Sequence, residues 1–296
     1  MASNPQSDCE LWLEAGNTLG EGPIMHPERC SLIWFDVPEA RMFERPLAGG
    51  PPRLHDLGVM ASAAALVDER RVLIATETDL KLFDLDTGVA SSVIPFLPGR
   101  PDLRSNDSCV HPAGAFWISS MGKRAETDAG AIWWFRAGEL RLIYERITIG
   151  NAICFTPDGM IAYFADSARR TIWRVVTDPE TGLPAGEPDV FRVFTDGEGE
   201  PDGAVVDADG RVWVASWGSS AVFVLNPDGS LHDTCTVPVS QPTCPAFIGD
   251  HLDGMLLTSA REGLSAAALD QEPLAGSVFH IRRKVKGVPE PRIRLA

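Results

Sequence analysis

The chain has 296 residues, of which 44% are hydrophobic and 23% charged, and its formal net charge is −15. This composition is that of a globular protein and excludes disordered, collagen-like and coiled-coil chains. The 27 glycines and 23 prolines favour many turns over long helices. The acidic balance disfavours binding to nucleic acid or to an anionic membrane, because both select basic surfaces.

The polar N-terminal segment 1–8 has neither the basic nor the apolar stretch of a signal peptide. No run of the chain approaches the roughly 18 apolar residues of a membrane-spanning helix. We therefore expect a cytoplasmic protein, either a monomer or a small homo-oligomer. The six cysteines form no Cys-x-x-Cys pair, so we expect free thiols.

One pattern recurs along the chain: a turn, followed by a short strand of apolar and β-branched residues. In chain order, these predicted strands are residues 32–36, 72–76, 116–119, 161–166, 212–216 and 256–259. A second strand follows each of them, with an aromatic residue at the same place: Phe43, Phe83, Trp133, Trp173, Phe223 and Phe279. The recurrence indicates six copies of one structural unit.

A spacing of about 40–50 residues is typical of a β-propeller blade with four strands. The sequence therefore predicts an all-β fold, a six-bladed β-propeller with four-stranded antiparallel blades. No linker interrupts the array, so we expect a single domain over 1–296, with its core at about 15–285. A β-sandwich with accidental internal similarity is the alternative.

Polar residues recur at one phase of this repeat. Eight positions before the fourth residue of the turn stand Glu21, Asn106, Asn151 and Asp202. Each opens a short apolar segment that we expect to be the innermost strand of its blade, so these side chains would converge near the propeller axis. The second blade offers Ser62 at this phase, and the same count in the sixth blade falls on Ala246.

Carboxylate and amide oxygens, without thiolate or imidazole, suit a hard divalent cation such as Ca²⁺, Mg²⁺ or Mn²⁺, with Zn²⁺ and Fe(II) as alternatives. Three or four protein ligands would leave coordination positions for water and substrate. The structural alternative is that these polar residues cap the starts of strands.

The sequence also resembles the SMP-30/gluconolactonase/regucalcin-like family of six-bladed propeller lactonases, over about residues 15–285. The similarity rests on short segments that occur in order and in the right blades: Leu19–Pro23, Arg104–Asp107, Ser120–Gly122, Ile149–Ala152, Pro201–Gly203, Val212–Ala215 and Ser259–Leu264.

The resemblance implies metal-dependent hydrolysis of a sugar lactone to the open-chain sugar acid. It implies one divalent metal cation bound by Glu21, Asn151 and Asp202, with Asp202 as the catalytic general acid/base. It further implies that Arg104 and Asn106 contact the sugar lactone.

Lys123 marks a departure from the family, because some members carry a substrate-contacting glutamate at or near this position. A cation here is compatible with a lactone that bears a carboxylate, such as an aldaric acid lactone. It is equally compatible with a hydrogen bond to a sugar hydroxyl, or with a side chain that points to solvent.

Other catalytic motifs are absent from the sequence. No Gly-x-Ser-x-Gly elbow and no His-Glu-x-x-His motif occurs, and His26 and His111 occupy matched turn positions that indicate a structural role. Most of the eight tryptophans fall at repeat positions and are expected in the core. The rival functions are a metal-dependent propeller hydrolase of phosphotriesters or aryl esters, and a non-catalytic calcium-binding or protein-interaction propeller.

Overall fold

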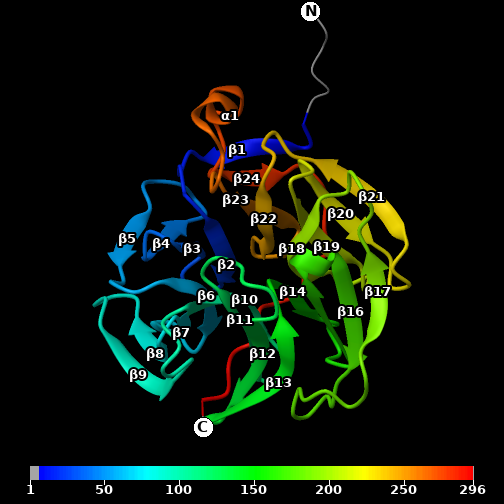
Figure 1. Ribbon diagram of the computed structural model, residues 1–296. Helices are drawn as coiled ribbons and strands as arrows, with labels where there is room; N and C mark the ends of the chain where they lie inside the picture. The colour runs from blue at the N-terminus through cyan, green and yellow to red at the C-terminus, as the bar shows by residue number, and fades with distance from the viewer. Residues whose placement is uncertain (1–6, 296) are drawn as a thin grey trace, which may run out of the picture.

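Six antiparallel sheets of four strands surround a common axis in the computed structural model, which describes residues 7–295 (Figure 1). This arrangement confirms the predicted six-bladed β-propeller. The strands of the first three blades are β2 (Gly20–His26), β3 (Ser31–Asp36), β4 (Arg41–Pro46) and β5 (Arg53–Asp56); β6 (Ala61–Leu66), β7 (Arg71–Thr76), β8 (Asp79–Asp84) and β9 (Ala90–Pro95); and β10 (Leu103–Val110), β11 (Phe116–Gly122), β12 (Gly130–Arg136) and β13 (Glu139–Ile147).

The remaining three blades complete the ring. Their strands are β14 (Gly150–Phe155), β15 (Ile161–Asp166), β16 (Thr171–Val176) and β17 (Asp189–Val193); β18 (Glu200–Val206), β19 (Val212–Trp217), β20 (Ala221–Leu225) and β21 (Leu231–Thr236); and β22 (Pro242–Ile248), β23 (Gly254–Ser259), β24 (Val278–Ile281) and β1 (Cys9–Leu13). A 3₁₀ turn, η1 (Ser167–Arg169), and one short helix, α1 (Ala266–Gln271), lie in loops. No helix within residues 7–295 is long and apolar enough to cross a membrane.

The sixth blade joins the two ends of the chain. Strand β1 pairs antiparallel with β24, with Cys9 opposite Ile281 and Glu10 opposite His280. The ring is thus closed by backbone hydrogen bonds and by side-chain packing. The packed part of the chain begins earlier than the expected limit of residue 15, because β1 supplies the outer strand of this blade.

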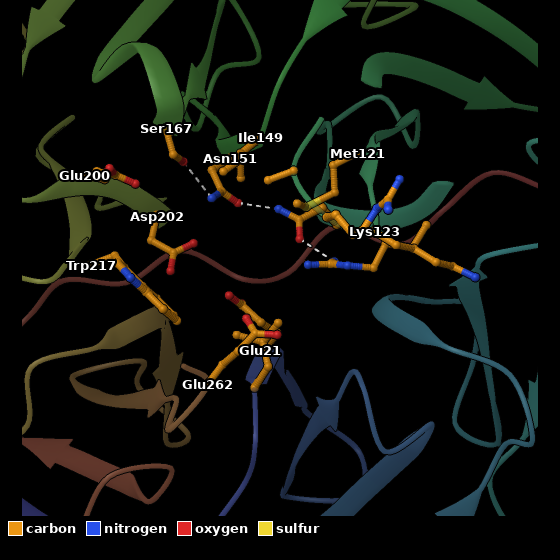
Figure 2. A pocket seen from close by; sticks show the side chains of 15 residues that line it. Glu21, Met121, Lys123, Ile149, Asn151, Ser167, Glu200, Asp202, Trp217 and Glu262 are labelled. Atoms are coloured by element: carbon orange, nitrogen blue, oxygen red, sulfur yellow. Dashed lines mark hydrogen bonds between the residues drawn. The ribbon is translucent and has the colours of Figure 1, made fainter. Parts of the chain in front are cut away.

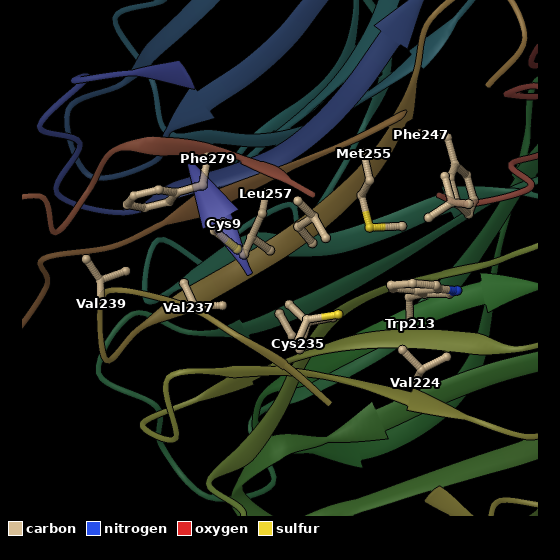
Figure 3. Packing of buried hydrophobic residues seen from close by; sticks show 14 of the residues in the cluster. Cys9, Trp213, Val224, Cys235, Val237, Val239, Phe247, Met255, Leu257 and Phe279 are labelled. Atoms are coloured by element: carbon tan, nitrogen blue, oxygen red, sulfur yellow. The ribbon is translucent and has the colours of Figure 1, made fainter. Parts of the chain in front are cut away.

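Each blade is stabilised by apolar contact with its neighbours, as expected for units that cannot bury their surfaces alone. Figure 3 shows one such interface, where Trp213 and Val224 of the fifth blade face Met255 and Leu257 of the sixth. The aromatics predicted at one place of the repeat all lie on the third strands of the blades, β4, β8, β12, β16, β20 and β24.

Two buried histidines connect neighbouring blades. The Nε2 atom of His26 lies 3.1 Å from the backbone oxygen of Asp68, and that of His111 lies 2.9 Å from the oxygen of Gly159. Their predicted structural role is confirmed. All six cysteines are free, and of these Cys30 is exposed.

The C-terminal segment 282–295, which we call the strap, crosses the end of the propeller where the first two strands of each blade are joined (Figure 1). Its backbone hydrogen bonds reach Ala208, Leu252, Leu66 and Gly114, which belong to four different blades. Ile293 is 7% exposed and packs in the same apolar cluster as Phe116. The packed chain therefore continues beyond the expected limit of residue 285.

We expect Ile293→Ala to lower the free energy of unfolding by about 2–3 kcal/mol, since a buried isoleucine would be truncated. Urea denaturation measures the change. Arg294→Ala removes an exposed side chain from the same segment and should cost under about 0.5 kcal/mol. Equal, small effects of both substitutions would show that the strap contributes little to the core.

The strap also carries Glu290 to the axis, where it lines a small space together with Asp107 and Cys109. Burial raises the pKa of Glu290 to about 7. The folded state therefore binds more protons than the unfolded state above the ordinary glutamate pKa of about 4.3. The resulting stabilisation is complete below that value and is lost as the pH rises through about 7.

Glu290→Gln should remove this part of the pH dependence. Between about pH 5 and about pH 8, the unfolding free energy of the variant should fall less than that of the unaltered protein. Urea denaturation at both pH values measures the difference, and Glu187→Gln, at an exposed position, is the matched control. An unchanged pH dependence in Glu290→Gln would contradict the assignment.

Candidate active site

A cavity of about 360 Å³ opens at the end of the propeller opposite the strap, and we call it the axial pocket. The six residues that the sequence analysis assigned to the metal or the substrate line it: Glu21, Arg104, Asn106, Lys123, Asn151 and Asp202. Figure 2 shows Glu21 and Asp202 facing each other across the pocket, with Asn151 beside them. The structure therefore brings the whole predicted set together.

The inner strands aim these side chains at the axis through β-bulges. In each blade one extra residue interrupts the pairing of the first strand with the second. Glu21 and Asn151 are the last paired residues before their bulges, whereas Asn106 and Asp202 lie inside theirs. A bulge re-directs a side chain, so residues of equal phase converge even though their pairing differs by one position.

The backbone conformation of Gly22 explains why the Leu19–Pro23 segment has a glycine at this position. It adopts a φ of 56°, in the left-handed region, directly after Glu21. A Cβ atom here would collide with the backbone oxygen of Ser62 in the next blade. The glycine thus allows the bulge to form while the first two blades approach closely.

Buried aspartates anchor the loops that lead into two of these strands. Asp36 accepts hydrogen bonds of 3.0 Å from the backbone N–H groups of Thr18 and Leu19. Asp166 does the same for Thr148 and Ile149, at 3.0 and 3.1 Å. Each anchored loop runs directly into the strand that carries a candidate metal ligand.

A chain of hydrogen bonds fixes the polar side chains of the third and fourth blades. Arg104 donates to the Asn106 side-chain oxygen at 2.6 Å, and the Asn106 amide donates to Asn151 Oδ1 at 2.8 Å. The Asn151 amide in turn donates to Ser167 Oγ at 2.8 Å, and Ser167 donates to the backbone oxygen of Pro201 at 2.6 Å. The chain orients the Asn151 amide and ends beside Asp202.

The other two blades place hydroxyl groups at this level. Ser62 donates to the backbone oxygen of Asn106 at 2.5 Å, and Thr243 donates to that of Gly20 at 2.6 Å. Ala246, on which the sequence count fell, instead pairs with Leu256 in the core. The count in this blade starts from Gly254, which already belongs to the second strand, β23. In the other blades the residue from which the count starts precedes the second strand, so the count fails here.

The carboxylates around the pocket raise one another's pKa values. Burial raises the pKa of Asp202 well above its ordinary value, and the charges of Glu21 and Asp107 raise it further. Burial and Asp107 likewise raise the pKa of Glu21. Burial lowers the pKa of Arg104, although Glu262, Glu21 and Asp202 oppose this shift. The negative charge gathered here would be compensated by a bound cation.

Lys123 forms an ion pair that the sequence did not reveal. Its Nζ atom lies 2.5 Å from Glu77 Oε2. The other oxygen of Glu77 accepts a hydrogen bond of 3.1 Å from the backbone N–H of Met60. Burial raises the pKa of Glu77, but Lys123 and Met60 outweigh it, so the net shift is downward.

Several other residues in or next to the pocket escaped the sequence analysis. Ser167 and Trp217 stand at or directly after the ends of the second strands β15 and β19, and Glu77 directly follows β7. Because the first two strands of a blade are antiparallel, the end of the second lies beside the start of the first. This matched position is the signal that could have found them. Trp217 lines the pocket and also packs against an apolar core cluster, so this tryptophan is not confined to the core.

The donor set fits a hard divalent cation. Glu21 and Asp202 offer carboxylate oxygens, and Asn151 offers an amide oxygen with a free lone pair. The lining of the pocket contains no cysteine and no histidine among the described residues. Within residues 7–295, no three acidic, histidine or cysteine side chains are grouped so that they could hold a metal ion by themselves, so an amide oxygen would have to join the carboxylates.

Comparison with known proteins places this arrangement in a family. A family model described as the SMP-30/gluconolactonase/LRE-like region matches residues 19–261. A provisionally named sugar lactone lactonase of Rhizobium meliloti is 41% identical, over 95% of this chain and 96% of its own. The L-arabinolactonase of Azospirillum brasilense is 33% identical, over 98% and 96%.

A solved structure shares the same architecture. The crystal structure of a calcium-binding protein, regucalcin, from Agrobacterium tumefaciens superposes with a TM-score of 0.94 at 41% identity, covering 95% of this chain and 96% of that one. The chain therefore belongs to the SMP-30/gluconolactonase/LRE-like family.

Proposed function

We propose that the protein is a lactonase that hydrolyses the cyclic ester of a sugar acid to the open-chain acid. Family membership and the names of the relatives support this activity. The axial pocket, at about 360 Å³, lies within the size range of small-molecule sites, roughly 300–1,000 Å³. Its carboxylates, amides and guanidinium group suit a substrate rich in hydroxyl groups.

The observation that carries the proposal is the position of Asp202. The residue is 5% exposed, faces the pocket, and has only the backbone N–H of Gly203 as a hydrogen-bond partner within residues 7–295. A buried carboxylate that no other side chain engages is available to a ligand or to a reacting water molecule.

One divalent cation completes the proposed site, with Glu21, Asn151 and Asp202 as its protein ligands. Oxygen donors favour Ca²⁺, Mg²⁺ or Mn²⁺, and Zn²⁺ or Fe(II) are alternatives. When bound, such a cation supplies Lewis-acid polarisation of the lactone carbonyl. The Asn106–Asn151–Ser167 hydrogen bonds keep the Asn151 amide oxygen directed into the pocket.

Asp202 acts as the general acid/base of the proposed reaction. A carboxylate oxygen accepts a proton from the attacking water molecule and returns it to the ring oxygen as the ester bond breaks. Arg104 and Asn106, which are hydrogen-bonded to each other at 2.6 Å, hold the sugar against this group. Lys123 contributes to the wall of the pocket.

A calcium-binding protein without catalysis is the second candidate. The regucalcin structure, described as a calcium-binding protein, favours it, because this chain resembles it over almost its full length. The two candidates differ in a simple measurement: both bind a cation, but only the lactonase turns over a lactone.

We expect Asp202→Asn to lower the rate of lactone hydrolysis by a factor of about 10²–10⁴ at saturating cation, because the general acid/base is lost. A pH-stat assay on a panel of sugar lactones, before and after chelation of the metal, measures this activity. Calorimetric titration with Mn²⁺ separates lost metal binding from lost chemistry.

The exposed Asp250→Asn is the matched control and should retain the full rate. Full activity of Asp202→Asn would contradict its assigned role. Cation binding by the unaltered protein without turnover of any lactone would support the calcium-binding candidate instead.

Ser167→Ala should weaken cation binding by about 10–100-fold, since an outer hydrogen bond that orients a metal ligand would be lost. The readout is the Kd for Mn²⁺ from calorimetry, independent of activity. Ser167→Thr keeps the hydroxyl and should restore most of the affinity, while Ser230→Ala, in an exposed turn, is the control. An unchanged Kd in Ser167→Ala would show that the Asn151 amide is oriented without it.

A further inference from the structure

We propose that Glu77 is a specificity-determining residue, which holds the Lys123 ammonium so that this wall of the pocket accepts the hydroxyl groups of a neutral lactone and disfavours a lactone that carries a free carboxylate. The inference rests on the proposed lactonase function and names the substrate class. It chooses between the two kinds of lactone that Lys123 left open in the sequence.

The first argument is the geometry of the ion pair. Glu77 follows the second strand of the second blade and Lys123 that of the third, and their charged atoms lie 2.5 Å apart. The two side chains are 18% and 32% exposed, so the pair is partly shielded from solvent. In Figure 2 the Lys123 side chain runs away from Glu21 and Asp202 at the centre of the pocket.

Both partners of this pair are held in place by their own backbone. Lys123 donates its N–H to the oxygen of Asp102 at 2.9 Å, and Glu77 donates to that of Met60 at the same distance. The Met60 N–H in turn donates to the Glu77 carboxylate at 3.1 Å. Pre-positioned in this way, the carboxylate holds the ammonium at little entropic cost.

The second argument is the charge of the pocket wall. Four carboxylates line it (Glu21, Glu200, Asp202 and Glu262), against three cations (Arg104, Lys123 and Arg124). Two of these cations are already paired, Lys123 with Glu77 and Arg124 with Glu126 at 2.9 Å. With the two partners included, acids exceed bases by three, and a bound divalent cation would reduce this excess without reversing it.

The third argument is hydrogen-bonding capacity. An ammonium has three donors, and the ion pair uses one of them, so two remain for hydroxyl oxygens. A neutral polyol can accept from these donors, whereas a substrate carboxylate would have to compete with Glu77 for the ammonium and would approach a like charge.

The test compares two lactones that differ in one group: gluconolactone, with a terminal hydroxymethyl group, and the monolactone of glucaric acid, with a terminal carboxylate. We expect the unaltered protein to prefer the neutral substrate, and the ratio of the two kcat/KM values measures this preference. Glu77→Gln frees the ammonium and should shift this ratio roughly tenfold toward the acid lactone. Glu77→Gln combined with Lys123→Gln should lose that shift.

Two further variants keep the test decisive. Lys123→Gln alone leaves the Glu77 carboxylate uncompensated and should move the ratio further toward the neutral lactone. Glu139→Gln breaks a similar ion pair, with Arg141 at 2.6 Å, at a remote site and controls for the change itself. Thermal melting confirms that each variant is folded.

Three results would overturn the proposal: a preference of the unaltered protein for the acid lactone, an unshifted ratio in Glu77→Gln, or a shift toward the acid lactone in Lys123→Gln. Any of these leaves the lactonase function intact. Absence of turnover on every lactone would instead reject the proposed function, so the two failures are distinguishable.

Discussion

The inner strands of this propeller can be buried only against one another, and this constraint governs the rest of the molecule. The first strand of each blade packs against the first strands of its neighbours around the axis. Six strands that meet in this way bring their starts to one end of the ring and their ends to the other. One end becomes the axial pocket, and the other is covered by the strap.

The β-bulges of the inner strands direct polar side chains into one site. A regular strand would alternate its side chains between the two sides of its sheet, but the extra residue near each start lets polar groups project toward the axis. Close approach of the blades then imposes local requirements, such as the left-handed Gly22 against Ser62. The same crowding places acidic groups together, which explains why burial and like charge act on Glu21 and Asp202 in the same direction.

The blades could be predicted from the sequence because their signals are local. Each repeat carries its own turn, its own β-branched strand and its own aromatic residue, and Glu21, Asn106, Asn151 and Asp202 fall at a fixed phase within it. The strap could not be predicted in this way, because residues 282–295 have no periodicity and acquire their contacts only when the ring is closed. Glu77 and Ser167 were missed because they directly follow the second strands of their blades, at a repeat position other than the one that was followed.

The position of a residue within the repeat is shared by all six blades. Its contacts with the neighbouring blade are particular to this chain. Its position directly after β11 puts Lys123 on the wall of the pocket, but its chemistry depends on which group lies opposite in the adjacent blade. A lysine facing solvent would offer a mobile cation to an acidic ligand. A lysine held by Glu77, itself fixed by the Met60 N–H, forms a neutral pair and offers its remaining N–H donors. Substrate preference in this pocket is therefore a property of contacts between blades, and a single residue type at one position does not determine it.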